Sequence, residues 1–90
     1  MTNFTYEWQK FCKEYIIEFY KKNYNIDLTI EDVYVVWACK TLQNAKALLS
    51  TTVNGDGMYF ECTYNGDKNE MYFDIYKKQH NERIDLKDKF

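Results

Sequence analysis

The stretch ALLSTTVNGDGMYFECTYNGDKNEMYFDIY, residues 47–76, decides the fold. It holds three segments in which apolar residues alternate with other residues, separated by the pairs Asn54-Gly55 and Asn65-Gly66. Alternation predicts half-buried strands, and Asn-Gly between two such segments favours a tight hairpin because both turn positions need φ > 0. The stretch therefore predicts three consecutive antiparallel strands.

The two predicted turns can be compared through the strand registers that they impose. The first turn pairs Leu49 with Phe60, and the second pairs Phe60 with Met71. Both registers place the same apolar residues on one face, which favours a single buried face of a meander. These residues are Ala47, Leu49, Met58, Phe60, Cys62, Met71, Phe73 and Ile75.

Two further elements precede this stretch. Residues 33–39, VYVVWAC, are rich in β-branched and aromatic residues and predict a first strand, with a weaker turn at Gln43-Asn44. Residues 4–24 place apolar residues at helical spacing, which predicts an amphipathic helix closed by Asn23 or Asn25. Its apolar stripe is expected to comprise Phe4, Trp8, Phe11, Cys12, Tyr15, Ile16 and Phe19.

The predicted fold class is α+β, in one domain spanning residues 1–90. A long N-terminal helix, residues 4–24, packs on one face of a four-stranded antiparallel β-meander, residues 33–77. A charged C-terminal tail, residues 79–90, follows. In this tail Ile84 and Leu86 either form a short fifth strand or lie loose.

Composition excludes several classes of protein. The chain has 90 residues, 46% hydrophobic and 29% charged, with a formal net charge of −2, which fits one small domain. The acidic balance is unlike the basic surface of a general DNA-binding protein, so nucleic acid is not the favoured partner. The apolar runs are too short to cross a membrane, and the N-terminus lacks the features of a secretory signal. We expect a cytoplasmic protein.

The chemistry-bearing residues do not form a recognisable catalytic or metal motif. The three cysteines include no CxxC pair, and each lies among apolar neighbours, which predicts buried, reduced thiols. A zinc site built from Cys12, Cys39, Cys62 and His80 matches zinc in ligand type but not in spacing. The sequence contains neither a P-loop nor a GxSxG elbow. We therefore expect no enzyme, no metal and no cofactor.

The face opposite the predicted core carries the candidate binding residues. Tyrosine supplies contact area with a polar handle, which suits protein recognition, but it is also simply a good strand former. The partner-binding residues predicted on this face are Tyr59, Glu61, Tyr72, Asp74 and Tyr76. Those predicted at the tip of the first hairpin are Lys40, Gln43, Asn44 and Lys46.

The first strand is predicted to be apolar on both faces. Alternation puts Val33, Val35, Trp37 and Cys39 on one face and Tyr34, Val36 and Ala38 on the other. An edge strand facing water is not expected to have this composition. Either the tail or another chain covers it, and we expect a partner or a second copy, which would make a homo-oligomer through this strand.

Three segments of the chain have a recognisable sequence: residues 33–52 (VYVVWACKTLQNAKALLSTT), 56–60 (DGMYF) and 63–73 (TYNGDKNEMYF). They resemble a small family of unknown function found in phages and prophages of Gram-positive bacteria. The resemblance covers residues 30–78 and implies a phage-encoded accessory protein in the cytoplasm of a bacterial host. It brings no catalytic residues.

The expected function is therefore to capture, and inhibit or modulate, a host or bacterial-defence protein. An alternative is a nucleotide or single-stranded nucleic-acid binder that stacks bases on the same tyrosines. A third class is a self-associating protein of the virion or its assembly.

Overall fold

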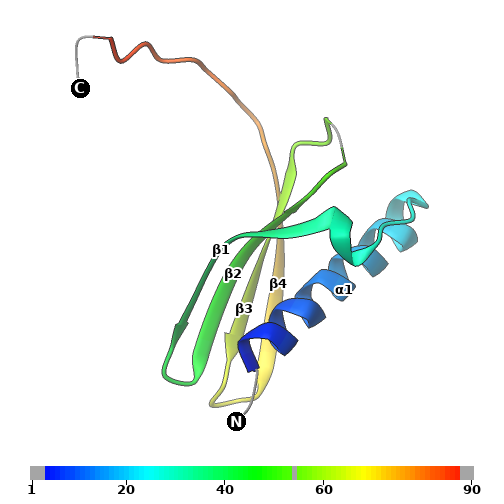
Figure 1. Cartoon of the computed structure of the whole chain (residues 1–90), viewed down its shortest axis with the longest axis vertical. Coiled ribbons are helices and arrows are strands. Elements are labelled where there is room, and N and C mark those ends of the chain that lie inside the picture. Colours follow the sequence, from blue (N-terminus) through cyan, green and yellow to red (C-terminus); the bar gives the residue numbers. More distant parts are fainter. Residues whose placement is uncertain (1–3, 54, 88–90) are drawn as a thin grey trace.

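A computed structural model describes residues 4–53 and 55–87 and has two layers (Figure 1). The first layer is helix α1, Phe4–Tyr24. A single 3-10 turn, η1 (Ile30–Asp32), leads into the second layer, a four-stranded antiparallel sheet in the order β1-β2-β3-β4. Its strands are β1 (Val33–Thr41), β2 (Asn44–Thr51), β3 (Met58–Asn65) and β4 (Glu70–Lys77). The α+β class, the helix and the meander are confirmed.

Helix α1 faces the sheet with residues spaced four apart. Trp8, Cys12, Ile16 and Tyr20 are buried along this stripe, whereas Phe11 and Tyr15, predicted within it, are about half exposed at its flank. Residues four apart form a row inclined by about 26° to the helix axis, and residues three apart follow a row inclined the other way, so Phe11 and Tyr15 fall to one side of the buried stripe. The predicted stripe was thus centred too far to that side and missed Tyr20.

The helix ends as its asparagines suggested. Asn25 has a φ of 55° and donates its backbone N–H to the carbonyl of Lys21 at 3.1 Å. Asparagine tolerates this left-handed conformation better than most residues, so it can satisfy a carbonyl that the helix would otherwise leave unpaired. Asn25, the second of the two predicted closing residues, therefore ends the helix.

The pairing of β2 with β3 has the predicted register, with Leu49 opposite Phe60. The connection is longer than a two-residue turn, since it extends from 52 to 57, and Asn54 of the predicted turn lies outside the described residues. The predicted register is kept because the connection extends beyond the predicted turn by the same number of residues on each side.

The pairing of β3 with β4 corrects a prediction, because Phe60 lies opposite Ile75 rather than Met71. The connection is a four-residue turn, 66–69, in which Asn69 rather than Gly66 has a positive φ, of 50°. The partner of Phe60 is displaced by four positions, and an even displacement keeps every side chain on its predicted face. Phe60 and Cys62 are accordingly buried, while Met71 and Phe73 pack against the core from the rim.

A β-bulge in β1 overturns the predicted faces of that strand. Val35 pairs with Leu49 and Trp37 with Leu48, so Val36 is an extra residue without a partner. After the bulge every side chain changes face: Trp37 and Cys39 lie opposite to Val33 and Val35 instead of beside them. Cys39 is consequently exposed, not buried as predicted.

The tip of the first hairpin differs from prediction by one residue. The turn is formed by Leu42 and Gln43, with Leu42 at a φ of 55°, and Asn44 already belongs to β2. Gly66 lies against this turn so closely that a Cβ there would stand 2.1 Å from the backbone oxygen of Gln43. The two turns at this end of the sheet therefore pack on each other.

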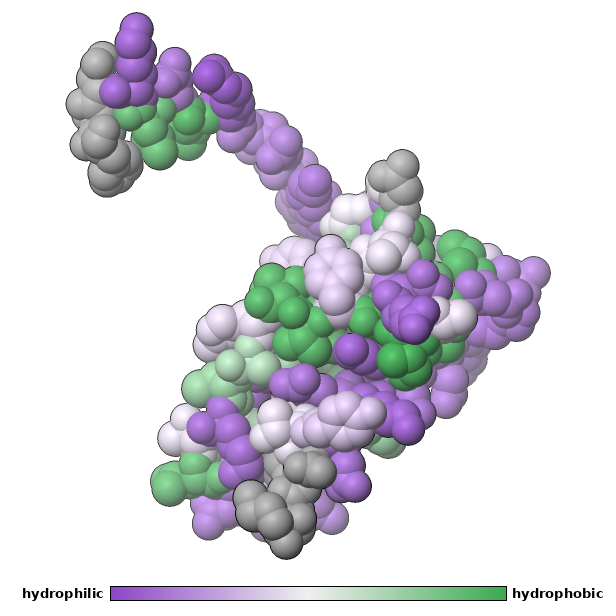
Figure 2. Space-filling view, in the orientation of Figure 1, coloured by the Kyte–Doolittle hydropathy of each residue, from purple (hydrophilic) through white to green (hydrophobic). Residues whose placement is uncertain are grey.

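The tail leaves the body of the molecule. In Figure 2 it projects as a narrow, mostly hydrophilic arm, and residues 79–87 are all exposed. Within the described part of the tail there is no fifth strand, and Ile84 is 71% exposed. The tail therefore does not cover β1.

Candidate functional site

The face of the sheet turned away from α1, here called the outer face, has no second layer over it among the described residues (Figure 1). Its members follow from the strand registers and alternate with the buried residues. From β1 and β2 they are Tyr34, Trp37, Cys39, Thr41, Asn44, Lys46, Leu48 and Ser50; from β3 and β4 they are Tyr59, Glu61, Thr63, Asn65, Glu70, Tyr72, Asp74 and Tyr76.

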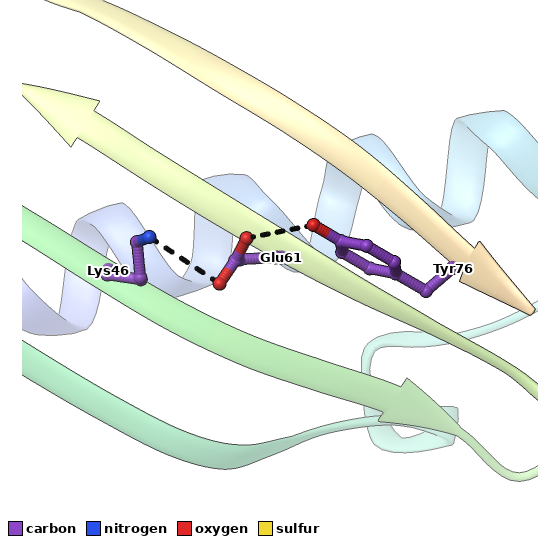
Figure 3. Close-up of polar contacts among 3 residues, drawn as sticks. All are labelled: Lys46, Glu61 and Tyr76. Atoms are coloured by element: carbon purple, nitrogen blue, oxygen red, sulfur yellow. Dashed lines mark hydrogen bonds and ion pairs between the residues drawn. The ribbon is translucent and has the colours of Figure 1, made fainter.

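The centre of the outer face is a polar network across three strands (Figure 3). Glu61 on β3 accepts a hydrogen bond at Oε1 from the Tyr76 hydroxyl of β4, at 3.3 Å. Its Oε2 lies 3.5 Å from the ammonium nitrogen of Lys46 on β2. Each partner comes from a different neighbouring strand, so the carboxylate connects side chains of three strands. The sheet register thus brings together three of the predicted binding residues.

Two tyrosines stack beside this network. The Tyr59 and Tyr76 rings lie opposite each other on β3 and β4, with centroids 5.2 Å apart and planes 19° from parallel. The negative charge of Glu61, followed by burial and the charge of Asp74, raises the pKa of Tyr76 above its ordinary value. The pair therefore presents partly exposed aromatic surface next to carboxylates.

Tyr72 is the third predicted tyrosine and lies nearer the turn. Its hydroxyl donates to Glu70 Oε1 at 2.7 Å, and this hydrogen bond raises the pKa of Tyr72. The side chain is 55% exposed. It belongs to the same face as Tyr59 and Tyr76, as alternation predicted.

Asp74 completes the predicted set and lies directly opposite Glu61. Like charges in opposite positions of an antiparallel pair destabilise it. Lys46 compensates Glu61, but no ion pair links Asp74 to any residue among 4–53 and 55–87. The β4 side of the outer face therefore carries uncompensated negative charge.

The bulge adds Trp37 to this face, whereas regular alternation predicted it on the same side as Val33 and Val35. Trp37 is 53% exposed and lies opposite Leu48. It borders a shallow hollow of about 270 Å³ whose wall includes Cys39, Lys46 and Thr63. Regular alternation gives no signal for a bulge, so the sequence could not place this indole here.

The other hairpin-tip residues have different positions. Lys40 pairs with Ala45, which is buried, so it lies on the helix side of the sheet, and its ammonium donates to the carbonyl of Leu42 at 2.7 Å. The Asn44 amide oxygen accepts the backbone N–H of Gly66 at 3.3 Å. Gln43 lies in the turn itself. Of the four predicted tip residues, Lys46 alone contacts the Glu61 network.

A second hollow lies at the opposite end of the sheet, where the tail begins. It has a volume of about 480 Å³, and its lining includes Tyr59, Lys77, Lys78 and His80. The Lys78 backbone N–H donates to the Gly57 carbonyl at 2.6 Å and fixes the start of the tail there. The lining thus includes one tyrosine, two lysines and a histidine, together with the acidic residue Asp56.

The structure brings Cys12 and Cys62 together but separates them from Cys39 and His80. Cys12 and Cys62 are buried between helix and sheet, where their mutual hydrogen bond and burial raise the pKa of the Cys12 thiol. Cys39 lies on the outer face, and His80 pairs with Glu82 in the tail. Across the described ranges, no group of three or more His, Cys, Asp or Glu side chains has the geometry for a metal.

Within the same ranges, no helix has both the length and the apolar character needed to cross a membrane. A sequence model of DUF6275, described as a family of unknown function, matches residues 9–86, which include all four strands and most of α1. No curated protein and no solved structure matches the chain.

Proposed function

The chain belongs to DUF6275, a family of unknown function, and we propose that it is a non-enzymatic binding protein. In this proposal it is phage-encoded, acts in the cytoplasm of a bacterial host, and captures a host or defence protein to inhibit or modulate it. The contact is made by the outer face, centred on Tyr59, Tyr72 and Tyr76.

The observation that supports this proposal is the aromatic character of an uncovered sheet face. An antiparallel sheet with one face on its core normally exposes polar residues on the other face. Here four tyrosines and a tryptophan are 39–55% exposed on that side: Tyr34, Trp37, Tyr59, Tyr72 and Tyr76. Aromatic residues are enriched at protein interfaces, and a contiguous exposed patch of them is typical of a binding surface.

The proposal is tested by capture from lysate of a Gram-positive bacterium with the tagged full chain. The variant Tyr59→Ala/Tyr72→Ala/Tyr76→Ala should lose the captured protein while keeping its unfolding transition. The matched control is Tyr6→Ala/Phe11→Ala, which removes aromatic rings that are 67% and 53% exposed on α1. A folded triple variant that still captures the same protein would overturn the assignment to the outer face.

The hollow beside Tyr59 favours a second candidate function, the binding of a nucleotide. Lys77, Lys78 and His80 would meet its phosphates, and Tyr59 would stack on its base. The carboxylates on the outer face oppose a longer nucleic acid. Titration with ATP and with a labelled oligonucleotide at 50 and 200 mM salt separates these cases, because phosphate contacts weaken steeply with salt.

Self-association through β1 also stays a proposal. The strand is an edge of the sheet and exposes Tyr34, Val36 and Trp37. The bulge at Val36 interrupts its regular row of backbone groups, and bulged edges resist pairing with another strand. A second copy would therefore bind through side chains of the outer face, and light scattering of the purified chain would reveal the dimer.

A further inference from the structure

The charge on the outer face specifies the partner more closely. Its charged members are three carboxylates, Glu61, Glu70 and Asp74, and one ammonium, Lys46. Resting on the function proposed above, we infer that the partner presents a basic, arginine-bearing segment to this face. An acidic or phosphate-rich partner would meet like charges here.

One row of residues across the sheet gives the contact a direction. The registers align Trp37, Leu48, Glu61 and Asp74 side by side from β1 to β4. Neighbouring strands lie about 4.8 Å apart, so the row is roughly 14 Å long. Its β1 end is apolar and borders the hollow beside Trp37, whereas its β4 end is acidic. A matching segment places an apolar side chain over Trp37 and Leu48 and a cation over Glu61 and Asp74.

Asp74 is the outer-face carboxylate that a cation from the partner would stabilise most. It opposes Glu61, and the ammonium of Lys46 reaches Glu61 from the far side of that carboxylate. In the isolated chain the opposition costs stability. A cation of the partner placed between the two carboxylates would relieve their repulsion. Asp74 would therefore strengthen binding although it does not stabilise the fold.

Arginine fits better than lysine because of the neighbouring rings. The stacked Tyr59 and Tyr76 lie beside Asp74 and Glu61, and Tyr76 already donates its hydroxyl to Glu61. A planar guanidinium can stack on an aromatic face while it donates two parallel hydrogen bonds to a carboxylate. An ammonium group is a hydrated point charge and cannot do both.

The decisive variant is Asp74→Asn, with Asp67→Asn as the matched control. Asp67 is exposed in the β3–β4 turn, and the change removes the same charge outside the outer face. The probes are capped tetra-arginine, tetra-lysine and tetra-glutamate peptides, added to labelled full chain and followed by amide chemical shifts. Tetra-arginine should shift Leu48, Glu61, Asp74 and Tyr76, and bind at least threefold more tightly than tetra-lysine.

Asp74→Asn should weaken tetra-arginine binding at least threefold without lowering the stability of the fold, whereas Asp67→Asn should change neither. Equal weakening by both variants, or shifts confined to the turn at Asp67, would overturn the inference. In the lysate experiment, a partner lost with the tyrosine variant but fully retained by Asp74→Asn would leave the proposed function standing and refute the basic partner. Retention by both variants would refute the function itself.

Discussion

At the scale of single residues, Tyr20 links the helix to the loop before β3. Its ring is 1% exposed, and its hydroxyl donates to Asp56, which also accepts the backbone N–H of Met58 at 3.0 Å. Burial and the hydrogen bond to Asp56 raise the pKa of Tyr20 to about 12. The folded state therefore holds the tyrosine proton more tightly than the unfolded chain does.

This linkage predicts a loss of stability in alkali. The stabilisation is complete below pH 10, the ordinary pKa of tyrosine, and disappears as the pH rises towards 12. A shift of this size corresponds to about 2–3 kcal/mol. Tyr20→Phe should lower the free energy of unfolding by about 1.5–3 kcal/mol at pH 7, and the difference from the wild type should shrink between pH 10 and 12.

Urea denaturation of both chains at several pH values measures this effect. Tyr6→Phe is the control, because Tyr6 is 67% exposed. A difference between wild type and Tyr20→Phe that stays constant up to pH 12 would contradict the linkage.

Gly66 gives a second prediction at this scale. Any Cβ at this position must displace the backbone of Gln43, so Gly66→Ala should cost about 1–3 kcal/mol by overpacking. It should also shift the amide resonances of Gln43 and Asn44. At Gly55 nothing lies within 4 Å, and Gly55→Ala meets only the strain of a φ of 80°. Loss of stability at Gly66 without movement of the first hairpin would be inconsistent with this contact.

At the scale of elements, alternation and periodicity were sufficient for most of the fold. The helix bounds, the strand order and the placement of Tyr59, Tyr72 and Tyr76 on one face follow from residue spacing alone, because spacing determines which face a side chain occupies. The turn before β4 was mispredicted because two residues exchange roles. Asn69 takes the left-handed conformation, while Gly66 serves the close approach to Gln43.

The bulge in β1 is the feature of the fold that could not be predicted from the sequence. VYVVWAC reads as a regular strand, and no residue in it requires an interruption. Two constraints act on β1. Val33 and Val35 pack on the core side of the sheet, whereas the later residues pair with β2 in a register set by the tight turn at Leu42. The extra residue, Val36, allows both to be met. Because these two constraints arise in different parts of the fold, the residue pattern of β1 alone does not predict the bulge.

This account predicts that deletion of Val36 is tolerated. Without the extra residue, Val35 and Trp37 become neighbours with regular alternation, so Trp37 stays on the outer face. Deletion of Ala38 is the matched control, because loss of the bulge would then place Trp37 opposite the buried Ala47, on the helix side of the sheet. Denaturation should show a smaller loss of stability for the Val36 deletion. In the Val36 deletion, acrylamide quenching should still show one exposed tryptophan, Trp37, in addition to the buried Trp8.

At the scale of the whole molecule, one helix packs on one face of the sheet, and nothing within residues 4–53 and 55–87 forms a layer over the other face (Figure 1). Ninety residues provide a modest core, and a fold of this size buries a smaller fraction of its surface than a larger domain does. Folding of the described residues therefore leaves the aromatic outer face exposed. In our proposal its burial is completed by another molecule, and the tail has no part in it.

Removal of the tail tests this division directly. A chain ending at Lys78 keeps every strand and the hydrogen bond from Lys78 to Gly57, and loses residues whose described members are all exposed. Its free energy of unfolding should stay within about 0.5 kcal/mol of the full chain. The radius of gyration should fall from 15.5 Å to about 12 Å, the size of a compact domain, in small-angle X-ray scattering. Capture of the partner should be unchanged, since a loss on truncation would place part of the binding surface on the tail.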